Sequence, residues 1–204
     1  CNTVAQAKKM YSELKNQVGD VYLLHSQFTV RDRAQLEKAI AEFAPNSDSR
    51  NTRSGIWITT QIVEASLDVD FDTLFTELSV LDSLFQRMGR CYRNRNYNGF
   101  EPNIYVYTKD VSGIGRNNAV YDLDLFERSL NALLPFHNMK LNEQMKQNLV
   151  EKLYHSKNLS GTKYFSVFQE SLKVLENPDF DSMTRTKAQR LLRDIQNVQV
   201  IPNS

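Results

Sequence analysis

Apolar residues in the first half of the chain recur with two different spacings. Val4, Ala7, Tyr11 and Leu14 lie three or four residues apart, which predicts a helix that Asn2 or Thr3 can cap. An apolar run of strand length follows at 21–25. The same two patterns then predict a helix with its apolar face at Leu36, Ala39, Ile40 and Phe43, a polar loop at 45–54, strands at 56–60 and 73–77, a helix with the stripe Leu81, Leu84, Phe85 and Met88, and a strand at 103–108.

Strands that alternate with helices of this length are typical of crossover units, in which parallel strands form one sheet and helices cover both of its faces. We therefore expect an α/β domain over residues 1–110. Because its first helix begins almost at the first residue, we also expect the chain to be cut from a longer protein. Beyond residue 110 the spacing is mainly helical, so a helical extension is predicted over 111–204, with a candidate final strand at 198–201.

Composition narrows the class of protein. With 204 residues, of which 41% are apolar and 24% charged, the chain has the size of one globular domain with at most an appendage. Its 25 Lys and Arg balance 24 Asp and Glu, so the net charge of +1 gives no evidence for nucleic-acid or membrane binding. The sequence contains no apolar run of membrane-spanning length, and its first residues lack the charged-then-apolar pattern of a signal peptide. Two cysteines, Cys1 and Cys91, make no disulfide framework, which fits a reducing cytoplasm.

The most unusual local sequence is the run 86–93. If the predicted helix continues through it, Gln86, Arg90 and Arg93 lie at i, i+4 and i+7, opposite the apolar stripe. An arginine has a rigid fork of donors that can hold two phosphate oxygens and neutralise charge during phosphoryl transfer. The run therefore indicates a phosphate-binding surface or, alternatively, a solvated basic end of a helix, which the helix dipole favours.

A second polar stretch, 59–70, directly follows a predicted strand. It combines hydroxyls, among them Thr60 and Ser66, with carboxylates such as Asp68. Ligands of open parallel sheets bind beyond the carboxyl ends of the strands, so these groups could meet a nucleotide or a phosphate backbone. The alternative is a turn and capping segment whose polar groups bond to the local backbone.

Together, in this order and spacing, the two stretches resemble motifs V and VI of superfamily 2 helicases. The second motif, Gln-Arg-x-Gly-Arg-x-x-Arg, is matched in full by Gln86, Arg87, Gly89, Arg90 and Arg93. The sequence 64–87 is more specifically similar to the CRISPR-associated helicase-nuclease of type I systems. Residues 23–28 resemble that family's preceding motif, and Asn2-Thr3 resembles the end of motif IV. The resemblance covers residues 1–108 well and the helical remainder only loosely.

The resemblance implies the second of two RecA-like domains, without its first strand, of a motor that uses ATP to move along single-stranded DNA. The implied catalytic residues are Arg90 and Arg93, facing the γ-phosphate; Gln86, Asp68 and Arg87 would contact the nucleotide or order the arginines, and Thr3, Ser26 and Thr60 would contact the DNA backbone. The implied partners are single-stranded DNA, the ATP-binding and nuclease domains of the same protein, and a CRISPR effector complex in the cytoplasm of a prokaryote.

Several motifs are missing from the sequence. Without a Gly-x-x-x-x-Gly-Lys-Thr/Ser loop or an Asp-Glu-x-His/Asp magnesium motif, ATP and Mg²⁺ are expected to bind the full-length protein and not this chain alone. His25, His137 and His155 are isolated in the sequence, so no metal site is predicted. Two other functions fit the same sequence: a superfamily 2 helicase acting on RNA or duplex DNA, and a catalytically silent module that binds nucleic acid or a protein.

Overall fold

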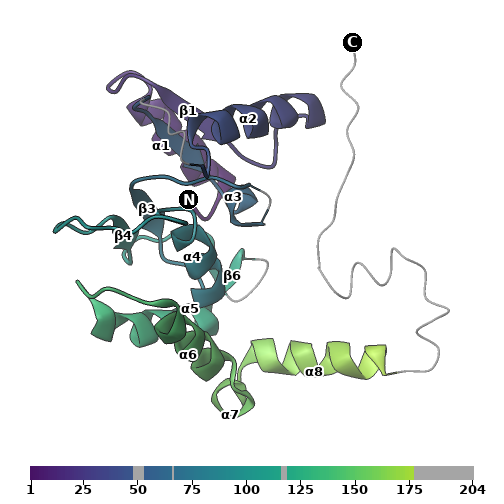
Figure 1. Ribbon diagram of the computed structural model, residues 1–204. Coiled ribbons are helices and arrows are strands. Elements are labelled where there is room, and N and C mark those ends of the chain that lie inside the picture. Colours follow the sequence, from purple (N-terminus) through teal and green to yellow (C-terminus); the bar gives the residue numbers. More distant parts are fainter. Residues whose placement is uncertain (48–52, 66, 116–118, 177–204) are drawn as a thin grey trace. The chain divides into compact units, whose positions relative to one another are not determined.

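The computed structural model describes residues 1–47, 53–65, 67–115 and 119–176 (Figure 1). The chain divides into two compact units, the first ending at Tyr154 and the second beginning at His155. Among the described residues, no helix has both the length and the apolar character needed to cross a membrane.

The first unit alternates helices with short strands, as the apolar spacing predicts. Each of the seven helices and strands predicted between residues 1 and 110 is present, with ends within a few residues of the expected ones. In chain order the elements are α1 (Val4–Leu14), β1 (Val21–Leu24), α2 (Val30–Phe43), β2 (Ile56–Thr59), α3 (Ile62–Ala65), β3 (Leu74–Glu77), α4 (Leu81–Met88), β4 (Ile104–Tyr107), β5 (Ile114–Gly115), β6 (Tyr121–Asp122), α5 (Leu123–Leu133), η1 (Leu134–Phe136) and α6 (Glu143–Tyr154).

Threonine side chains cap the first two helices. The Thr3 hydroxyl accepts a hydrogen bond from the Gln6 N–H at 3.2 Å, which satisfies one of the backbone donors that the start of α1 leaves unpaired. At the start of α2, Thr29 accepts from the Asp32 N–H at 3.2 Å and donates to the Asp32 carboxylate at 2.8 Å. The Thr3 cap agrees with the sequence prediction.

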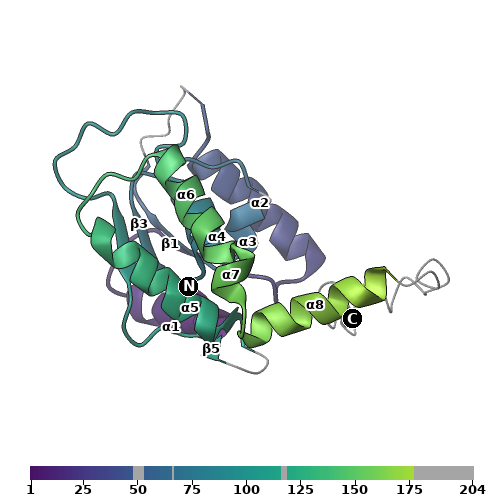
Figure 2. The same ribbon diagram turned by 90° about the horizontal axis from the view of Figure 1, so that it is seen from below.

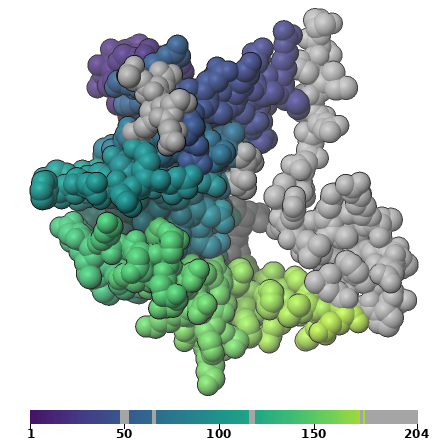
Figure 3. Space-filling view, in the orientation of Figure 1, coloured from purple at the N-terminus to yellow at the C-terminus, as the bar shows by residue number. Residues whose placement is uncertain are grey.

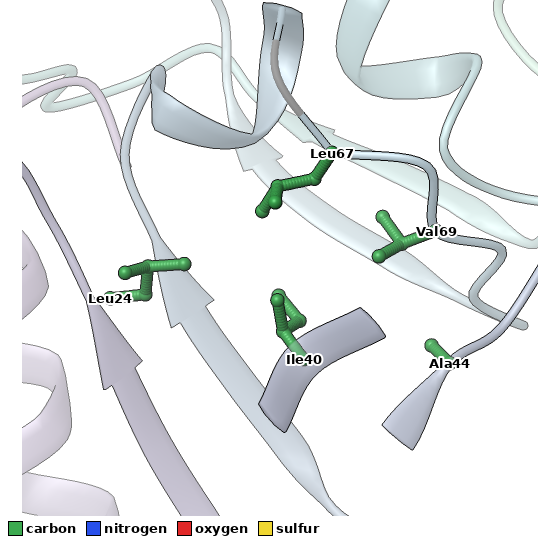
Figure 4. Close-up of a cluster of buried hydrophobic side chains, with 5 residues drawn as sticks. All are labelled: Leu24, Ile40, Ala44, Leu67 and Val69. Atoms are coloured by element: carbon green, nitrogen blue, oxygen red, sulfur yellow. The ribbon is translucent and has the colours of Figure 1, made fainter. Parts of the chain in front are cut away.

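Strands β1 and β2 are parallel, with Val21 opposite Ile56 and Leu24 opposite Thr59. One face of this pair packs against α2 in a cluster of buried apolar side chains. Figure 4 shows its five buried members, which come from β1, from α2 and the residue after it, and from the segment that follows α3: Leu24, Ile40, Ala44, Leu67 and Val69. Helix α1 contacts both strands.

Strands β3 and β4 form a second parallel pair, and β5 and β6 a third. The parallel α/β class is confirmed, but within the described residues no ladder joins β2 to β3, so the strands form separate pairs in place of one continuous sheet.

The first two residues lie between the carboxyl ends of β2 and β3. The Cys1 amine donates to the Thr59 carbonyl at 2.8 Å, and the Asn2 N–H donates to the Glu77 carboxylate at 2.7 Å. The third pair was not predicted, because strands of two residues show no periodicity.

Helices α5 and α6 pack directly on α4 and complete the first unit (Figures 1 and 2). Leu84 of α4 lies in one apolar cluster with Phe126 of α5, and Leu81 of α4 lies in another with Leu149 of α6. In the space-filling view the green atoms of this part lie directly against the teal atoms of the α/β part (Figure 3). The compact unit therefore extends past residue 110, where the sequence predicted a boundary, because α4 buries apolar side chains against both parts.

The second unit contains the short helix α7 (Ser156–Leu159) and α8 (Lys163–Leu175). The Thr162 hydroxyl accepts from the Phe165 N–H at 3.2 Å and so caps α8. The predicted final strand at 198–201 lies outside the described residues.

Candidate functional site

The carboxyl ends of β1 and β2 carry two of the three residues expected to contact DNA. Ser26 follows β1 in an exposed turn, and Thr60 follows β2 with only 5% of its surface exposed. Thr3 is half-buried, and its hydroxyl, which caps α1, also donates to the Ser112 hydroxyl at 3.1 Å. Ser26 is therefore the most accessible of the three.

His25, beside Ser26, is buried and borders a cavity of about 600 Å³. Its ring stacks on Phe28 with 4.4 Å between centroids, and its Nδ1 accepts from the Gln27 N–H at 3.2 Å. Burial, with a smaller contribution from the Lys8 charge, lowers the pKa of His25 below its usual value. These contacts favour a neutral imidazole that shapes the turn carrying Ser26.

The first arginine of the run 86–93, Arg87, lies in the interior. Its side chain is 4% exposed, and its Nε donates to Glu64 Oε1 at 2.7 Å. The other donors reach four acceptors, which come from the N-terminal residues, β3 and β6: Asn2 Oδ1 and Thr76 Oγ1, each at 2.9 Å, the Glu77 carbonyl at 3.3 Å, and the Tyr121 hydroxyl at 2.8 Å. We refer to Arg87 and these partners as the Arg87 network.

Arg87 was expected to contact the nucleotide or to order the arginines, and in the structure its guanidinium is engaged by protein acceptors. A buried ion pair of this kind is stable only when further hydrogen bonds satisfy the remaining donors and acceptors. Here Ser83 also donates to the second Glu64 oxygen, at 3.1 Å. Arg87 therefore ties α3, β3 and α4 to the N-terminal residues and to β6.

Helix α4 ends at Met88, so the predicted helical face of Gln86, Arg90 and Arg93 does not exist. Gly89 and Arg90 form a turn, and the chain then leaves the helix. Gln86 is exposed in the last turn of the helix. The arginines are therefore carried by a loop, which we call the arginine loop and define as residues 90–95.

Arg90 folds back onto α3. Its Nε donates to the Val63 carbonyl at 3.0 Å, and its Nη2 donates to the Glu64 carbonyl. These are carbonyls of the last turn of a helix, where a cation is favoured. Burial and the neighbouring Arg93 charge lower the pKa of Arg90. In this conformation Arg90 joins the arginine loop to α3.

Arg93 is the more accessible of the two candidate catalytic arginines, with 37% of its side chain exposed. Its Nη1 lies 3.4 Å from Oδ1 of Asp68, whose side chain is 70% exposed. Asn46 donates to the same Asp68 oxygen at 2.9 Å and accepts from Asn94 at 3.0 Å. Asp68, expected either to contact the nucleotide or to order the arginines, is thus paired with Arg93.

Sequence reasoning missed the residues that hold the arginine loop from behind. Asp70 is 4% exposed and accepts from the Arg93 N–H at 3.1 Å and from Arg95 Nε at 2.5 Å. The local sequence gave no signal for the burial of Asp70, because a residue that alternates with the apolar Val69 and Phe71 is expected on the opposite, exposed face. Nothing local to Arg95 indicated its partner.

No group of three or more His, Cys, Asp or Glu side chains able to hold a metal ion occurs among the described residues.

The chain was compared with known proteins. A family model described as CRISPR-associated nuclease/helicase Cas3, C-terminal, matches residues 1–96. CRISPR-associated nuclease/helicase Cas3 of Methanothermobacter thermautotrophicus is 31% identical over 209 aligned residues, which take in 100% of this chain and 24% of that protein. CRISPR-associated endonuclease/helicase Cas3 of Escherichia coli is 41% identical over 59% of this chain and 14% of its own length.

Solved structures agree with these sequence matches. The crystal structure of T. fusca Cas3-ATP superposes with a TM-score of 0.64 and 28% identity, covering 86% of this chain and 22% of that one. The chain thus spans about a quarter or less of the proteins it matches. In sequence and in fold, the chain belongs to the CRISPR-associated nuclease/helicase Cas3 family and corresponds to a C-terminal part of it.

Proposed function

We propose that this chain is the second RecA-like domain of an ATP-dependent, single-stranded DNA translocase coupled to DNA degradation in type I CRISPR defence. The observation that carries the proposal is the meeting of two distant segments: Arg90 bonds to the carbonyls of Val63 and Glu64, Arg93 pairs with Asp68, and the Arg93 side chain is partly exposed. The expected partners are single-stranded DNA, the ATP-binding and nuclease domains of the same protein, and a CRISPR effector complex.

The exposed pair of Arg93 and Asp68 fits a role toward phosphate. An ion pair this exposed contributes about 0–1 kcal/mol, so Arg93 can leave Asp68 at little cost. Its planar fork of donors then matches two oxygens of a phosphoryl group and neutralises charge that develops during transfer. Asp68 and the exposed Gln86 would orient Arg93 and the nucleotide.

ATP and Mg²⁺, when held by the other half of the site, would supply the phosphoryl group. The residues of this chain would bind and orient the phosphoryl group and neutralise the charge that develops on it. Arg90 would contribute by fixing the arginine loop against α3. Because this chain has no phosphate loop, it is expected to be inactive by itself.

The decisive test is Arg93→Ala in a full-length protein that carries this chain. An arginine supplied to phosphoryl transfer is worth about 10³ to 10⁵ in rate in GTPases, so DNA-stimulated ATP turnover should fall by about 10³ or more. Arg93→Lys should restore little, because an ammonium cannot reproduce the fork. Arg31→Ala, an exposed arginine of α2, is the matched control and should retain turnover. Wild-type turnover in Arg93→Ala would exclude the proposed role.

The DNA contacts are tested by affinity. Removing one hydroxyl contact costs about 1 kcal/mol, so Ser26→Ala and Thr60→Ala should each weaken single-stranded DNA binding about fivefold. The loss should be equal for unrelated sequences, because backbone contacts carry no base information. Anisotropy at one fixed salt concentration measures it, with the exposed Ser54→Ala as control. Unchanged affinity in both variants would show that the DNA does not contact Ser26 or Thr60.

Two alternatives predict other outcomes. A superfamily 2 helicase for RNA or duplex DNA would show turnover stimulated by those nucleic acids in preference to single-stranded DNA. A catalytically silent binding module would show no turnover in the full-length protein and no effect of Arg93→Ala.

A further inference from the structure

The arginine loop is attached to the segment before β3 by its backbone. The Phe71 N–H donates to the Arg90 carbonyl at 2.8 Å, and the Tyr92 N–H donates to the Phe71 carbonyl at 3.2 Å. These two bonds form an isolated parallel bridge between Phe71 and Cys91, both of which are at least partly buried. The bridge fixes the start of the loop but leaves Arg93, two residues later, to be held by side chains.

Asp70 supplies that second attachment. Its Oδ1 accepts from the Arg93 N–H and from Arg95 Nη2, each at 3.1 Å, and its Oδ2 accepts from Arg95 Nε at 2.5 Å. A carboxylate held by two nitrogens of one guanidinium has a fixed orientation, because both groups are planar. The backbone at Arg93 is therefore bonded to an acceptor whose position Arg95 determines. Arg95 also donates to the Phe71 carbonyl at 3.1 Å and to Asp72 at 3.3 Å.

Tyr92 completes the arrangement. Its φ is 49°, in the left-handed region that a residue with a large side chain seldom adopts, so the surrounding contacts must hold it there. The Arg95 Cζ lies 3.9 Å from the centre of the Tyr92 ring, within the range of a cation–π contact. The ring also meets Tyr97 edge-on, with 4.8 Å between centroids.

We propose that Arg95 and Asp70 are positioning residues for Arg93: they hold the backbone of the arginine loop so that the Arg93 guanidinium faces the phosphate. Tyr92 stabilises the turn that this requires. The proposal rests on the proposed function only for what Arg93 does, since the attachment of the loop follows from the contacts themselves. The hydrogen bonds from Arg95 to Asp70 also raise the pKa of Arg95, so its guanidinium is charged at every working pH. We call the pair of Arg95 and Asp70 the clamp.

The kinetic test uses a full-length protein that carries this chain. Misplacing a catalytic group by about 1 Å can cost about 10²-fold in rate, so Arg95→Ala should lower kcat by about that factor while KM changes less than about twofold. In an Arg93→Ala background, Arg95→Ala should cause no further loss, because its effect passes through Arg93. Arg95→Lys should recover only part of the rate, since one ammonium cannot hold both Asp70 oxygens. Arg128→Ala, an exposed arginine of α5, is the control.

Tyr92 offers a second comparison. Tyr92→Phe keeps the ring and should retain wild-type kcat, whereas Tyr92→Gly relieves the backbone strain, removes the ring and should lower kcat. Equal kcat for the two variants would show that the ring does not help to position the loop.

A readout that does not depend on turnover separates the two proposals. Hydrogen exchange of the Arg93 amide should accelerate about tenfold or more in Arg95→Ala and stay unchanged in Arg128→Ala, because only in the first does Asp70 lose the partner that fixes its orientation toward the Arg93 N–H. Unchanged exchange in Arg95→Ala overturns the clamp, and so does a further loss of kcat when Arg95→Ala is added to Arg93→Ala. Accelerated exchange together with wild-type turnover in Arg93→Ala would support the clamp and reject the proposed role of Arg93.

Discussion

Arg87 and Arg93 belong to one short motif but have opposite surroundings. Arg87 is 4% exposed and bonded to acceptors from distant parts of the chain, whereas Arg93 has 37% of its side chain exposed and one weak partner in Asp68. The difference arises because α4 ends between them. Arg87 lies on the inner face of the helix, while Arg93 follows the turn that leads out of it. Residues that a motif groups together can therefore differ: one is bonded within the interior of the fold and the other is accessible at its surface.

The largest difference between the two arginines should appear in stability. Arg87→Met leaves the Glu64 carboxylate buried without its partner, which costs about 3–5 kcal/mol of unfolding free energy. Arg93→Met should change it by less than about 0.5 kcal/mol, because Arg93 is largely a surface residue. Urea unfolding of the two variants of this chain measures both values.

A double variant tests the cause of that loss. In Glu64→Leu with Arg87→Met no charge is left buried, so the double variant should be more stable than Arg87→Met alone. If it is less stable, the loss comes from the neutral partners of Arg87 and not from the unpaired carboxylate.

The next largest effect should come from Tyr121, which lies at the far side of the Arg87 network. Its hydroxyl accepts from Arg87 Nη2 and donates to Ser83 at 3.3 Å. Tyr121→Phe leaves a buried guanidinium donor without an acceptor, which costs about 1–3 kcal/mol. Tyr107→Phe, at an exposed position of β4, is the control and should be close to neutral by the same urea assay. Equal stabilities for the two variants would mean that the network ends before Tyr121.

A smaller effect, dependent on pH, is expected from His25 in the turn that carries Ser26. Its pKa is lower in the folded chain than the unfolded value of about 6.5, so folding disfavours its protonation. The His25 contribution is therefore fully present above pH 6.5 and is lost as the pH falls below it, by at most about 1.4 kcal/mol per pH unit. Between pH 7.5 and 5.5, wild type should lose more stability than His25→Phe. His137→Gln, at an exposed position, should follow wild type.

Sequence patterns predicted the longer helices and strands up to β4, because each depends on nearby residues, but α3, β5 and β6 are too short to show a periodicity. The apolar spacing located α1, α2 and α4, and the Thr3 cap followed from local chemistry. The Arg87 network could not be predicted, since it joins Arg87 to Asn2 and Tyr121, 85 and 34 residues away along the chain.

At the candidate site, sequence patterns did not predict where α4 ends. The motif supplied Arg90 and Arg93, but a helix extended through Gly89 placed them on the wrong kind of element. Whether a polar side chain is buried depends on which distant groups can satisfy its hydrogen bonds, and a periodicity of four residues carries no such information. Asp70 and Arg95 were missed for this reason.

The bridge that fixes the arginine loop has a chemical consequence through Cys91. Burial, with the charges of Asp70 and Asp72, raises the pKa of this thiol to about 12. Only the thiolate reacts readily with peroxides, disulfides and alkylating reagents, and very little of it is present near neutral pH. The arginine loop thus contains a buried thiol that is protected from oxidation for as long as the domain stays folded.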